Sequence, residues 1–215
     1  MSRPLLVTDC DEVLLHMVAH FRDWVGEAHD CDFALDRGSF EGALTRRAGG
    51  TAIPGEEIWP MLDDFFEGEM ARQTLVPGAA EALARLGETA DVVILTNLQD
   101  RFNAARAEQL AALGIRHRVV TNQGGKGVPL RRLLDEYAPS VVAFVDDLPV
   151  HHQSAAKHTP EVWRVHMVAE PQLAPHVPDA EHAHVRLDRW ADAADWIAAH
   201  FADGMPALTP SVAAA

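Results

Sequence analysis

Short apolar runs ending in a carboxylate or hydroxyl residue recur along the chain, and segments with helical periodicity separate them. The runs have the length and continuous hydrophobicity of strands buried on both faces of a sheet, and they are residues 5–9 (LLVTD), 91–96 (DVVILT), 118–121 (RVVT) and 141–146 (VVAFVD). Apolar residues at three- and four-residue spacing predict helices over 79–86, 101–113 and 130–137. The alternation predicts an α/β fold, a Rossmann-like three-layer structure with helices on both faces of a parallel sheet.

Residues 16–74 interrupt this alternation directly after the first strand. They contain two helix-like segments, 16–29 and 56–72, joined by a Gly-containing connection with no convincing buried strand. An insertion at this point would lie above the carboxyl edge of the sheet, so we expect a helical cap. Residues 1–15 and 75–203 then form the core. Within the core, the stretch after Asp147 predicts a helix at 150–157, strands at 162–168 and 184–187, and a helix at 189–201. Residues 204–215 are expected to be a loose tail.

Composition narrows the classes of partner. The formal charge of −14 disfavours nucleic acid, because a nucleic-acid binder normally presents a basic patch to the phosphates. No stretch has the roughly 20 uncharged apolar residues of a membrane-spanning helix, and the N-terminus lacks the pattern of a signal peptide. Cys10 and Cys31 are too few for a disulfide framework. We therefore expect a cytoplasmic protein that binds neither nucleic acid nor membrane. The oligomeric state is left open.

Polar residues follow the predicted strands at their carboxyl ends. Because these ends meet at one edge of a parallel sheet, we expect the side chains to converge on one crevice. Carboxylates brought so close repel one another unless a cation intervenes, and oxygen-only ligands favour Mg²⁺. The converging residues are Asp9 with Asp11, Thr96 with Asn97, Lys126, and Asp146 with Asp147.

The same residues suggest phosphoryl chemistry. Lys126, with Thr96 and Asn97 beside it, is suited to hold the oxygens of a phosphoryl group. A metal and Lys126 together would keep Asp9 ionised as a nucleophile. Asp11 would give a proton to the departing alkoxide and later take one from water, although only geometry can settle where its side chain points.

Four segments of the chain resemble, in the same order, the four motifs of the haloacid dehalogenase-like (HAD) hydrolases. They are DCDEVL, VVILTN, GGKG with Lys126, and VAFVDD. The resemblance implies that Asp9 is the nucleophile, Asp11 the general acid and base, and that Thr96 and Lys126 bind the phosphoryl group. It also implies that Mg²⁺ is held by Asp146, the Asp9 side chain and the Asp11 backbone carbonyl. Asp147 would be a second metal contact or would orient Lys126. Residues 16–74 match the family's helical cap in position and character.

The motifs also distinguish phosphoryl transfer from halide displacement and from the chemistry of receiver domains. Family members that displace halide typically lack an acid two residues after the nucleophile, so Asp11 favours phosphoryl transfer. In a receiver domain the lysine would come last, whereas Lys126 precedes Asp146. We therefore expect a phosphomonoesterase acting on a small phosphorylated metabolite. The alternatives are a phosphotransferase or phosphomutase with the same residues, and an inactive binding or regulatory member.

Several other features are interpreted as structural. Glu12 and Val13 depart from the family pattern, and Glu12 would add negative charge near the phosphate. His16 and His20 have the spacing of two metal ligands on one helix face but lack an apparent third. His151 and His152 are expected to be exposed helix residues, with a substrate contact as the alternative. The expected role of Trp59, Phe65 and Phe66 is packing within the cap, with a substrate contact by one of them as the alternative.

Overall fold

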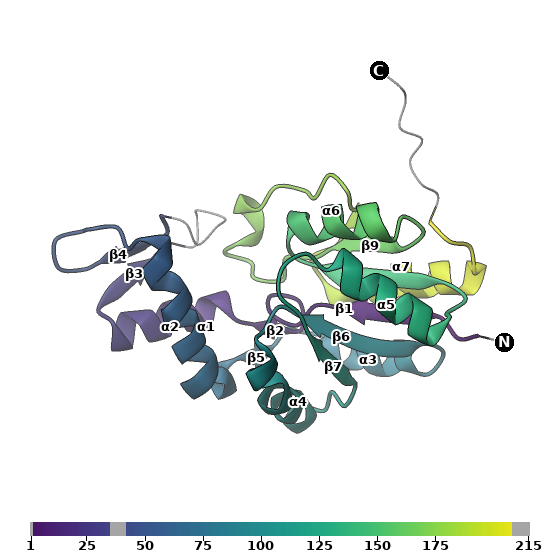
Figure 1. The fold of residues 1–215 in the computed structure, drawn as a ribbon, viewed down its shortest axis with the longest axis horizontal. Coiled ribbons are helices and arrows are strands. Elements are labelled where there is room, and N and C mark those ends of the chain that lie inside the picture. Colours follow the sequence, from purple (N-terminus) through teal and green to yellow (C-terminus); the bar gives the residue numbers. More distant parts are fainter. Residues whose placement is uncertain (1, 35–41, 208–215) are drawn as a thin grey trace, which may run out of the picture.

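The computed structural model describes residues 2–34 and 42–207. Within them the centre of the molecule is a six-stranded sheet with the strand order β10-β9-β8-β1-β6-β7, in which every neighbouring pair is parallel (Figure 1). The predicted parallel sheet is confirmed, with strand ends that differ from the prediction by up to two residues. The strands are β1 (Leu5–Thr8), β6 (Asp91–Thr96), β7 (Arg118–Thr121), β8 (Val142–Asp146), β9 (Trp163–His166) and β10 (Val185–Arg186).

The order of the strands marks a point beside β1 where a ligand site is expected. The chain runs from β1 to β6 and β7 on one side, then returns to place β8, β9 and β10 on the other side. The direction of winding therefore reverses between β1 and β8. In open parallel sheets, ligands bind at this point, outside the carboxyl ends of the strands.

Helices cover both faces of the sheet, which confirms the predicted three layers. Along β1 the side chains alternate: Leu6 packs with helices α3 (Ala79–Gly87), α4 (Asn103–Ala112) and α7 (Trp190–Asp203), while Leu5 and Val7 pack with α5 (Gly127–Tyr137) and α6 (Pro149–His158). This alternation is the two-residue period of a strand buried on both sides. Among the helices described, none is long and apolar enough to cross a membrane.

The segment inserted after β1 has a hydrophobic cluster of its own and projects from one end of the sheet (Figure 1). Its helices are α1 (Val18–Ala28) and α2 (Gly55–Gly68), followed by the 3-10 helix η2 (Met70–Arg72). Two short antiparallel strands, β2 (Leu15–His16) and β5 (Thr74–Leu75), join it to the core.

One expectation for this segment is wrong, because it contains strands. β3 (Cys31–Phe33) and β4 (Leu44–Arg46) form an antiparallel pair. Cys31, Phe33 and Leu44 point into the insert's cluster. Three residues per strand are too few to show an alternation of apolar and polar side chains. The sequence therefore did not predict these strands.

The expected tail begins in contact with the core. The indole Nε1 of Trp163 donates to the carbonyl of Met205 at 2.9 Å, and Ala207 N donates to the Glu161 carbonyl at 2.9 Å. Ala207 is also buried. Residues 204–207 are therefore docked rather than loose, and the rest of the predicted tail, 208–215, lies outside the described residues.

Candidate active site

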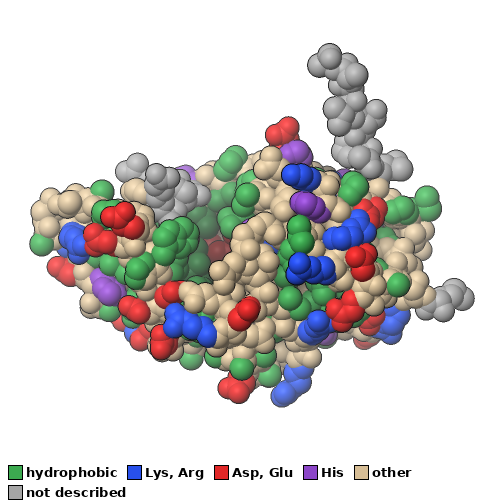
Figure 2. Space-filling model, in the orientation of Figure 1, with side chains coloured by type: hydrophobic (Ala, Val, Ile, Leu, Met, Phe, Trp, Pro, Cys, Tyr) green, Lys and Arg blue, Asp and Glu red, His purple; other side chains and the backbone are tan. Residues whose placement is uncertain are grey.

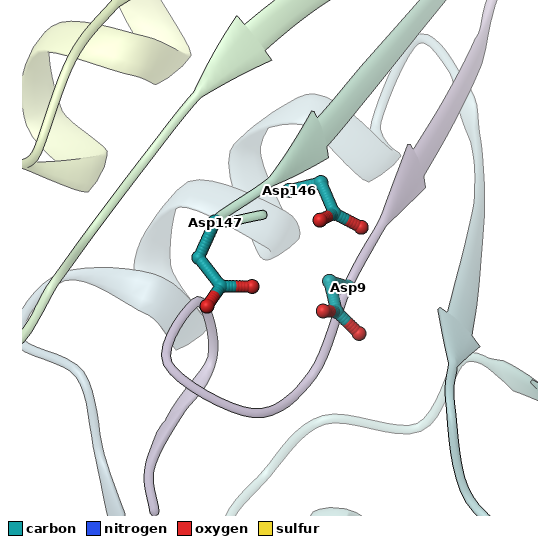
Figure 3. Close-up of side chains that lie close together, drawn as sticks. All are labelled: Asp9, Asp146 and Asp147. Atoms are coloured by element: carbon teal, nitrogen blue, oxygen red, sulfur yellow. The ribbon is translucent and has the colours of Figure 1, made fainter. Parts of the chain in front are cut away.

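Three acids meet at the carboxyl edge of the sheet. Asp9 follows β1, Asp146 ends β8 and Asp147 comes next, so all three lie at the reversal point (Figure 3). Each can offer a carboxylate oxygen within 4.8 Å of the others, and all are buried. They form the only group of three or more potential metal ligands found among the described residues. We call them the acidic cluster.

Lys126 bridges two members of this cluster. Its Nζ lies 2.7 Å from Asp9 Oδ1 and 2.7 Å from Asp146 Oδ2, and its side chain is fully buried. The residue stands at the start of α5, where Gly127 allows α5 to approach α6 closely: a Cβ on Gly127 would lie 2.1 Å from the Ser154 carbonyl oxygen. The glycine is therefore required for the helix contact that brings Lys126 to the acids.

The charge of the cluster fits a divalent cation. Three ionised carboxylates and one ammonium group leave a formal charge of −2. Burial and the charge of Asp146 raise the pKa of Asp9 despite Lys126, and burial, Asp146 and Asp9 raise the pKa of Asp147 well above its usual value. Burial lowers the pKa of Lys126, but Asp146 and Asp9 together raise it. A hard divalent cation would relieve the repulsion, and carboxylate oxygens are the ligands that Mg²⁺ prefers.

Hydrogen bonds leave particular oxygens available. Cys10 N donates to Asp9 Oδ1 at 2.7 Å, the oxygen that Lys126 also contacts. Within the described part of the chain, Asp9 Oδ2 has no such partner. Close by at the tip of β6, the Thr96 hydroxyl is buried without a hydrogen-bond partner. Both atoms are available to a ligand in the crevice.

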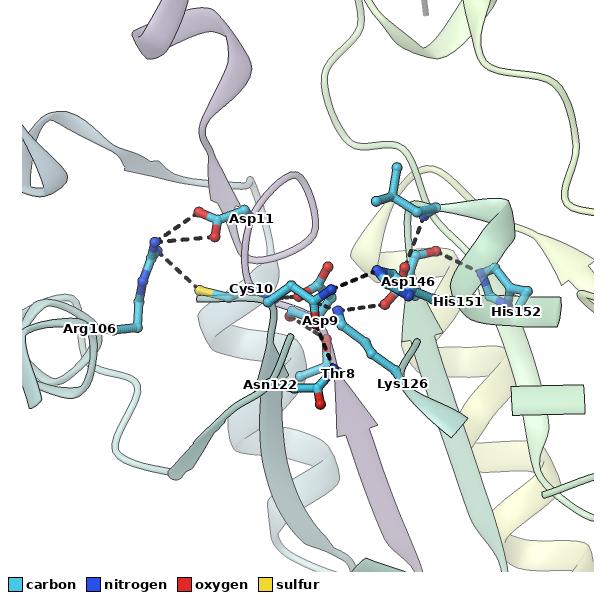
Figure 4. A network of polar contacts seen from close by, with 12 residues as sticks. Thr8, Asp9, Cys10, Asp11, Arg106, Asn122, Lys126, Asp146, His151 and His152 are labelled. Atoms are coloured by element: carbon cyan, nitrogen blue, oxygen red, sulfur yellow. Dashed lines mark hydrogen bonds and ion pairs between the residues drawn. The ribbon is translucent and has the colours of Figure 1, made fainter. Parts of the chain in front are cut away.

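Two imidazole rings form hydrogen bonds with the backbone carbonyls of Asp146 and Asp147. His152 Nε2 lies 2.9 Å from the Asp146 carbonyl oxygen (Figure 4). His166 Nε2 lies 2.8 Å from the Asp147 carbonyl oxygen. Ala180 N donates to His166 Nδ1 at 3.2 Å, so the ring proton is on Nε2 and donates to Asp147. Leu148 N completes the turn by donating to Asp146 Oδ1 at 2.9 Å.

Asn97 and His151 lie at the edge of the acidic cluster. Asn97 Nδ2 donates to the Gly124 carbonyl at 2.9 Å and lies 3.4 Å from His151 Nε2. Burial lowers the pKa of His151. His151 is therefore a neutral polar neighbour of the acids rather than an exposed helix residue.

Asp11 points away from the acidic cluster. Its carboxylate is bound by Arg106 of α4 (Figure 4) and by Gln73, where the insert meets the core. Gln73 Nε2 donates to Oδ1 at 2.6 Å, and Arg106 NH2 lies 3.0 Å from Oδ1 and 3.2 Å from Oδ2. The contact group of Asp11 is thus separate from that of Asp9.

The Glu12 carboxylate is bonded to the start of α1, although its charge still reaches the acidic cluster, where it helps to raise the pKa of Asp147. Its Oε1 accepts hydrogen bonds from Met17 N at 2.7 Å and Val18 N at 2.6 Å, at the start of α1. The backbone reaches this position through a left-handed conformation with φ of 61°. Burial raises the pKa of Glu12 to about 7. The residue stabilises the entry into the insert.

The fold of the chain is that of a known group of structures. The chain aligns with a protein assigned to the haloacid dehalogenase-like hydrolases from Burkholderia xenovorans LB400 at 19% identity and a TM-score of 0.61, covering 93% of this chain and 98% of that one. A HAD-like family hydrolase from Streptococcus pneumoniae aligns at 12% identity and a TM-score of 0.63, covering 90% and 97%. The chain has the HAD-like hydrolase fold. Protein-family models and curated proteins gave no match.

A third solved structure also aligns with the chain. It is a D,D-heptose 1,7-bisphosphate phosphatase from B. bronchiseptica in complex with magnesium and phosphate. It aligns at 16% identity and a TM-score of 0.50, covering 92% of this chain and 99% of that one. At such identities the likeness establishes the fold of the chain.

Most of the predicted site residues come together in this HAD-like fold. Asp9, Asp146, Asp147 and Lys126 are in one contact group, with Thr96 and Asn97 beside it. Asp11 alone is turned elsewhere. The sequence reasoning missed Arg106, although a signal existed: Phe102, Arg106 and Leu110 have four-residue spacing on one face of the α4 region, and all three are buried. A charge within an apolar stripe marks a buried ion pair.

The residues interpreted as structural have identifiable partners. His16 Nδ1 lies 3.4 Å from Glu170 Oε2, and His20 Nε2 lies 3.0 Å from Thr74 Oγ1. Phe65 is fully buried against other aromatic rings of the insert. On the same helix Phe66 contacts Phe102 of the core. Trp59 differs from the expectation of packing, because 64% of it is exposed. The space-filling view shows hydrophobic side chains beside the recess between insert and core (Figure 2).

Proposed function

We propose that the protein is a Mg²⁺-dependent HAD-like phosphohydrolase that releases phosphate from a small phosphorylated metabolite through a phospho-aspartate on Asp9. One observation carries the proposal: buried Lys126 joins Asp9 and Asp146, with Asp147 beside them, at the carboxyl edge of the sheet. A purely structural cluster would gain nothing from three mutually repelling acids.

The acidic cluster and the backbone carbonyl of Asp11 would hold the metal ion. The donors are all oxygen atoms, and the uncompensated charge of the cluster matches a divalent cation. When bound, Mg²⁺ would neutralise negative charge on the phosphoryl oxygens and on the acids. Lys126 and the unpartnered Thr96 hydroxyl would bind the same phosphoryl group, with Asn97 at the edge.

Asp9 would supply the nucleophile. Lys126 and Cys10 N fix Oδ1, so Oδ2 is the oxygen that attacks phosphorus. As the new O–P bond forms, the ester O–P bond breaks and the departing alkoxide takes a proton from Asp11, whose side chain would first have to turn from Arg106 and Gln73 toward the acidic cluster. Asp11 then takes a proton from water, which attacks the phosphorus of phospho-Asp9, and phosphate leaves while the Asp9 carboxylate is restored.

The physical setting also limits the substrate and the compartment. The acidic surface charge of the chain is unsuited to nucleic acid or to an anionic membrane, so the substrate is a small molecule. Both cysteines are free and buried, which fits the cytoplasm.

A panel of phosphorylated metabolites tests the function. We expect phosphate release from at least one metabolite and from a generic aryl phosphate with Mg²⁺ present, and its loss after chelation by EDTA, with recovery on adding Mg²⁺ back. Transfer to a sugar, the alternative activity, would produce a phosphorylated acceptor in place of free phosphate. Mg²⁺ binding by calorimetry without turnover of any compound would instead favour an inactive binding protein.

A further inference from the structure

The Asp147 side chain lacks the contacts that fix the other two members of the acidic cluster. Asp9 and Asp146 are both paired with Lys126, and the Asp146 carboxylate also accepts a hydrogen bond from Leu148 N at 2.9 Å. Within residues 2–34 and 42–207, no hydrogen bond or ion pair reaches the Asp147 carboxylate. It nevertheless lies beside the other two acids (Figure 3). The direction of this side chain therefore depends on how its backbone is held.

His166, the last residue of β9, holds that backbone. Its Nε2 donates to the Asp147 carbonyl at 2.8 Å, and its Nδ1 accepts from Ala180 N at 3.2 Å. The ring is fully buried, and both of its nitrogens are used. An imidazole bound at both nitrogens has one tautomer and one orientation. The Asp147 carbonyl is thus bound to a donor that is itself fixed.

Packing alone does not require an imidazole at this position. β9 lies inside the sheet, between β8 and β10, and the neighbouring Val165 packs in the core. A strand in this setting is usually apolar throughout. Burying a polar ring has a cost unless the ring is hydrogen-bonded. The presence of His166 is better explained by its two hydrogen bonds than by the packing of the sheet.

His152 offers an internal comparison. It is also fully buried, and its Nε2 lies 2.9 Å from the Asp146 carbonyl oxygen. That oxygen also accepts a hydrogen bond from Met167 N at 3.0 Å, and the carboxylate of the same residue is paired with Lys126. Asp146 therefore keeps several contacts without His152. Asp147 has no such substitutes for His166 among the contacts described.

We propose that His166 is a positioning residue that fixes the Asp147 backbone, so that the Asp147 carboxylate serves as a ligand of the divalent cation. The inference rests on the proposed function. The second role considered for Asp147, orienting Lys126, finds no contact to support it in the described part of the chain. His166 itself touches neither the ion nor the substrate.

Two amide substitutions separate the roles of the two ring nitrogens. In His166→Asn the side-chain oxygen can replace Nδ1 as the acceptor for Ala180 N, but no donor reaches Asp147. In His166→Gln the amide Nε2 can replace the ring Nε2. We expect calorimetry without substrate to show a Kd for Mg²⁺ raised about 10-fold in His166→Asn, the lower end of the range for residues that hold metal ligands. In His166→Gln the Kd should lie within about 3-fold of the wild type.

Activity and stability measurements distinguish positioning from a structural role. In His166→Asn the Mg²⁺ concentration for half-maximal phosphate release should rise by the same factor as the Kd, with kcat at saturating Mg²⁺ near the wild-type value. His152→Asn should raise the Kd less than His166→Asn does. His158→Asn, at an exposed position of α6, is the control and should leave the Kd unchanged. A lower urea midpoint in His166→Asn with an unchanged Kd would overturn the inference.

A double-mutant cycle tests whether His166 acts through Asp147. If it does, His166→Asn should not weaken Mg²⁺ binding further in the Asp147→Asn variant. An additive loss of affinity in the double variant would overturn the inference, because it would mean that His166 affects the ion by another route.

The outcomes also distinguish this inference from the function on which it rests. Mg²⁺-dependent phosphate release by the wild type, with Mg²⁺ bound equally well by His166→Asn, would refute the role of His166 and leave the phosphohydrolase intact. A wild-type protein that neither binds Mg²⁺ nor releases phosphate from any compound of the panel would overturn both.

Discussion

Replacing Asp9 with Asn should lower Mg²⁺-dependent phosphate release on the order of 10⁴-fold or more, as expected when a covalent nucleophile is removed. The amide has nearly the shape of the carboxylate, so Lys126 and Cys10 N can keep their places beside it. It offers no anionic oxygen for attack on phosphorus, and it removes one of the acids that would hold the metal. Initial rates with the aryl phosphate and with the best metabolite measure the loss.

Asp135→Asn is the matched control, because Asp135 is an exposed acid on α5 away from the acidic cluster. It should retain wild-type kinetics. Calorimetry on Asp9→Asn should show weaker Mg²⁺ binding independently of turnover. If Asp9→Asn kept more than about a tenth of the wild-type rate, a loss far below that of a removed nucleophile, another group would have to be the nucleophile.

Replacing Lys126 with Met should both destabilise and inactivate the protein. The substitution leaves Asp9 and Asp146 buried without their shared cation, and removing one partner of a buried ion pair typically costs about 3–5 kcal/mol. We expect a lower free energy of unfolding in urea when no divalent ion is present. Adding Mg²⁺ should recover part of that loss, since the ion binds only the folded cluster. Even with Mg²⁺ present, phosphate release should remain very low, because the phosphoryl group of the substrate has lost its contact with the Lys126 ammonium.

The chain contains one other lysine, which serves as the control. Lys157 is exposed near the end of α6, so Lys157→Met should change neither the urea midpoint nor the rate. A Lys126→Met variant as stable as the wild type without metal would contradict the coupling between Lys126 and the acids.

The features that the sequence predicted well share one physical cause. A strand buried on both faces must be continuously apolar, and its carboxyl end is where a polar residue becomes possible. Asp9, Thr96 and Asp146 therefore stand out without any knowledge of the fold. Their convergence follows from the parallel arrangement of the sheet.

The features that were missed depend on partners distant in the sequence. Nothing local identifies Gln73 as a ligand of Asp11, since the contact joins residues 62 positions apart. The His166 ring reaches Asp147 across neighbouring strands. Glu12 looked like an acid facing the phosphate, yet a left-handed turn directs it to the first turn of α1. Such contacts are set by loop geometry, which hydrophobic periodicity does not describe.

Trapping the covalent intermediate tests the central claim most directly. Wild-type protein mixed with a reactive aryl phosphate and Mg²⁺, quenched in acid within one turnover and digested, should carry one phosphoryl group on the peptide containing Asp9. Tandem mass spectrometry should locate it on Asp9 rather than Asp11, and Asp9→Asn should carry none. Phosphate release at the wild-type rate with no adduct, or with an adduct on another residue, would contradict the account.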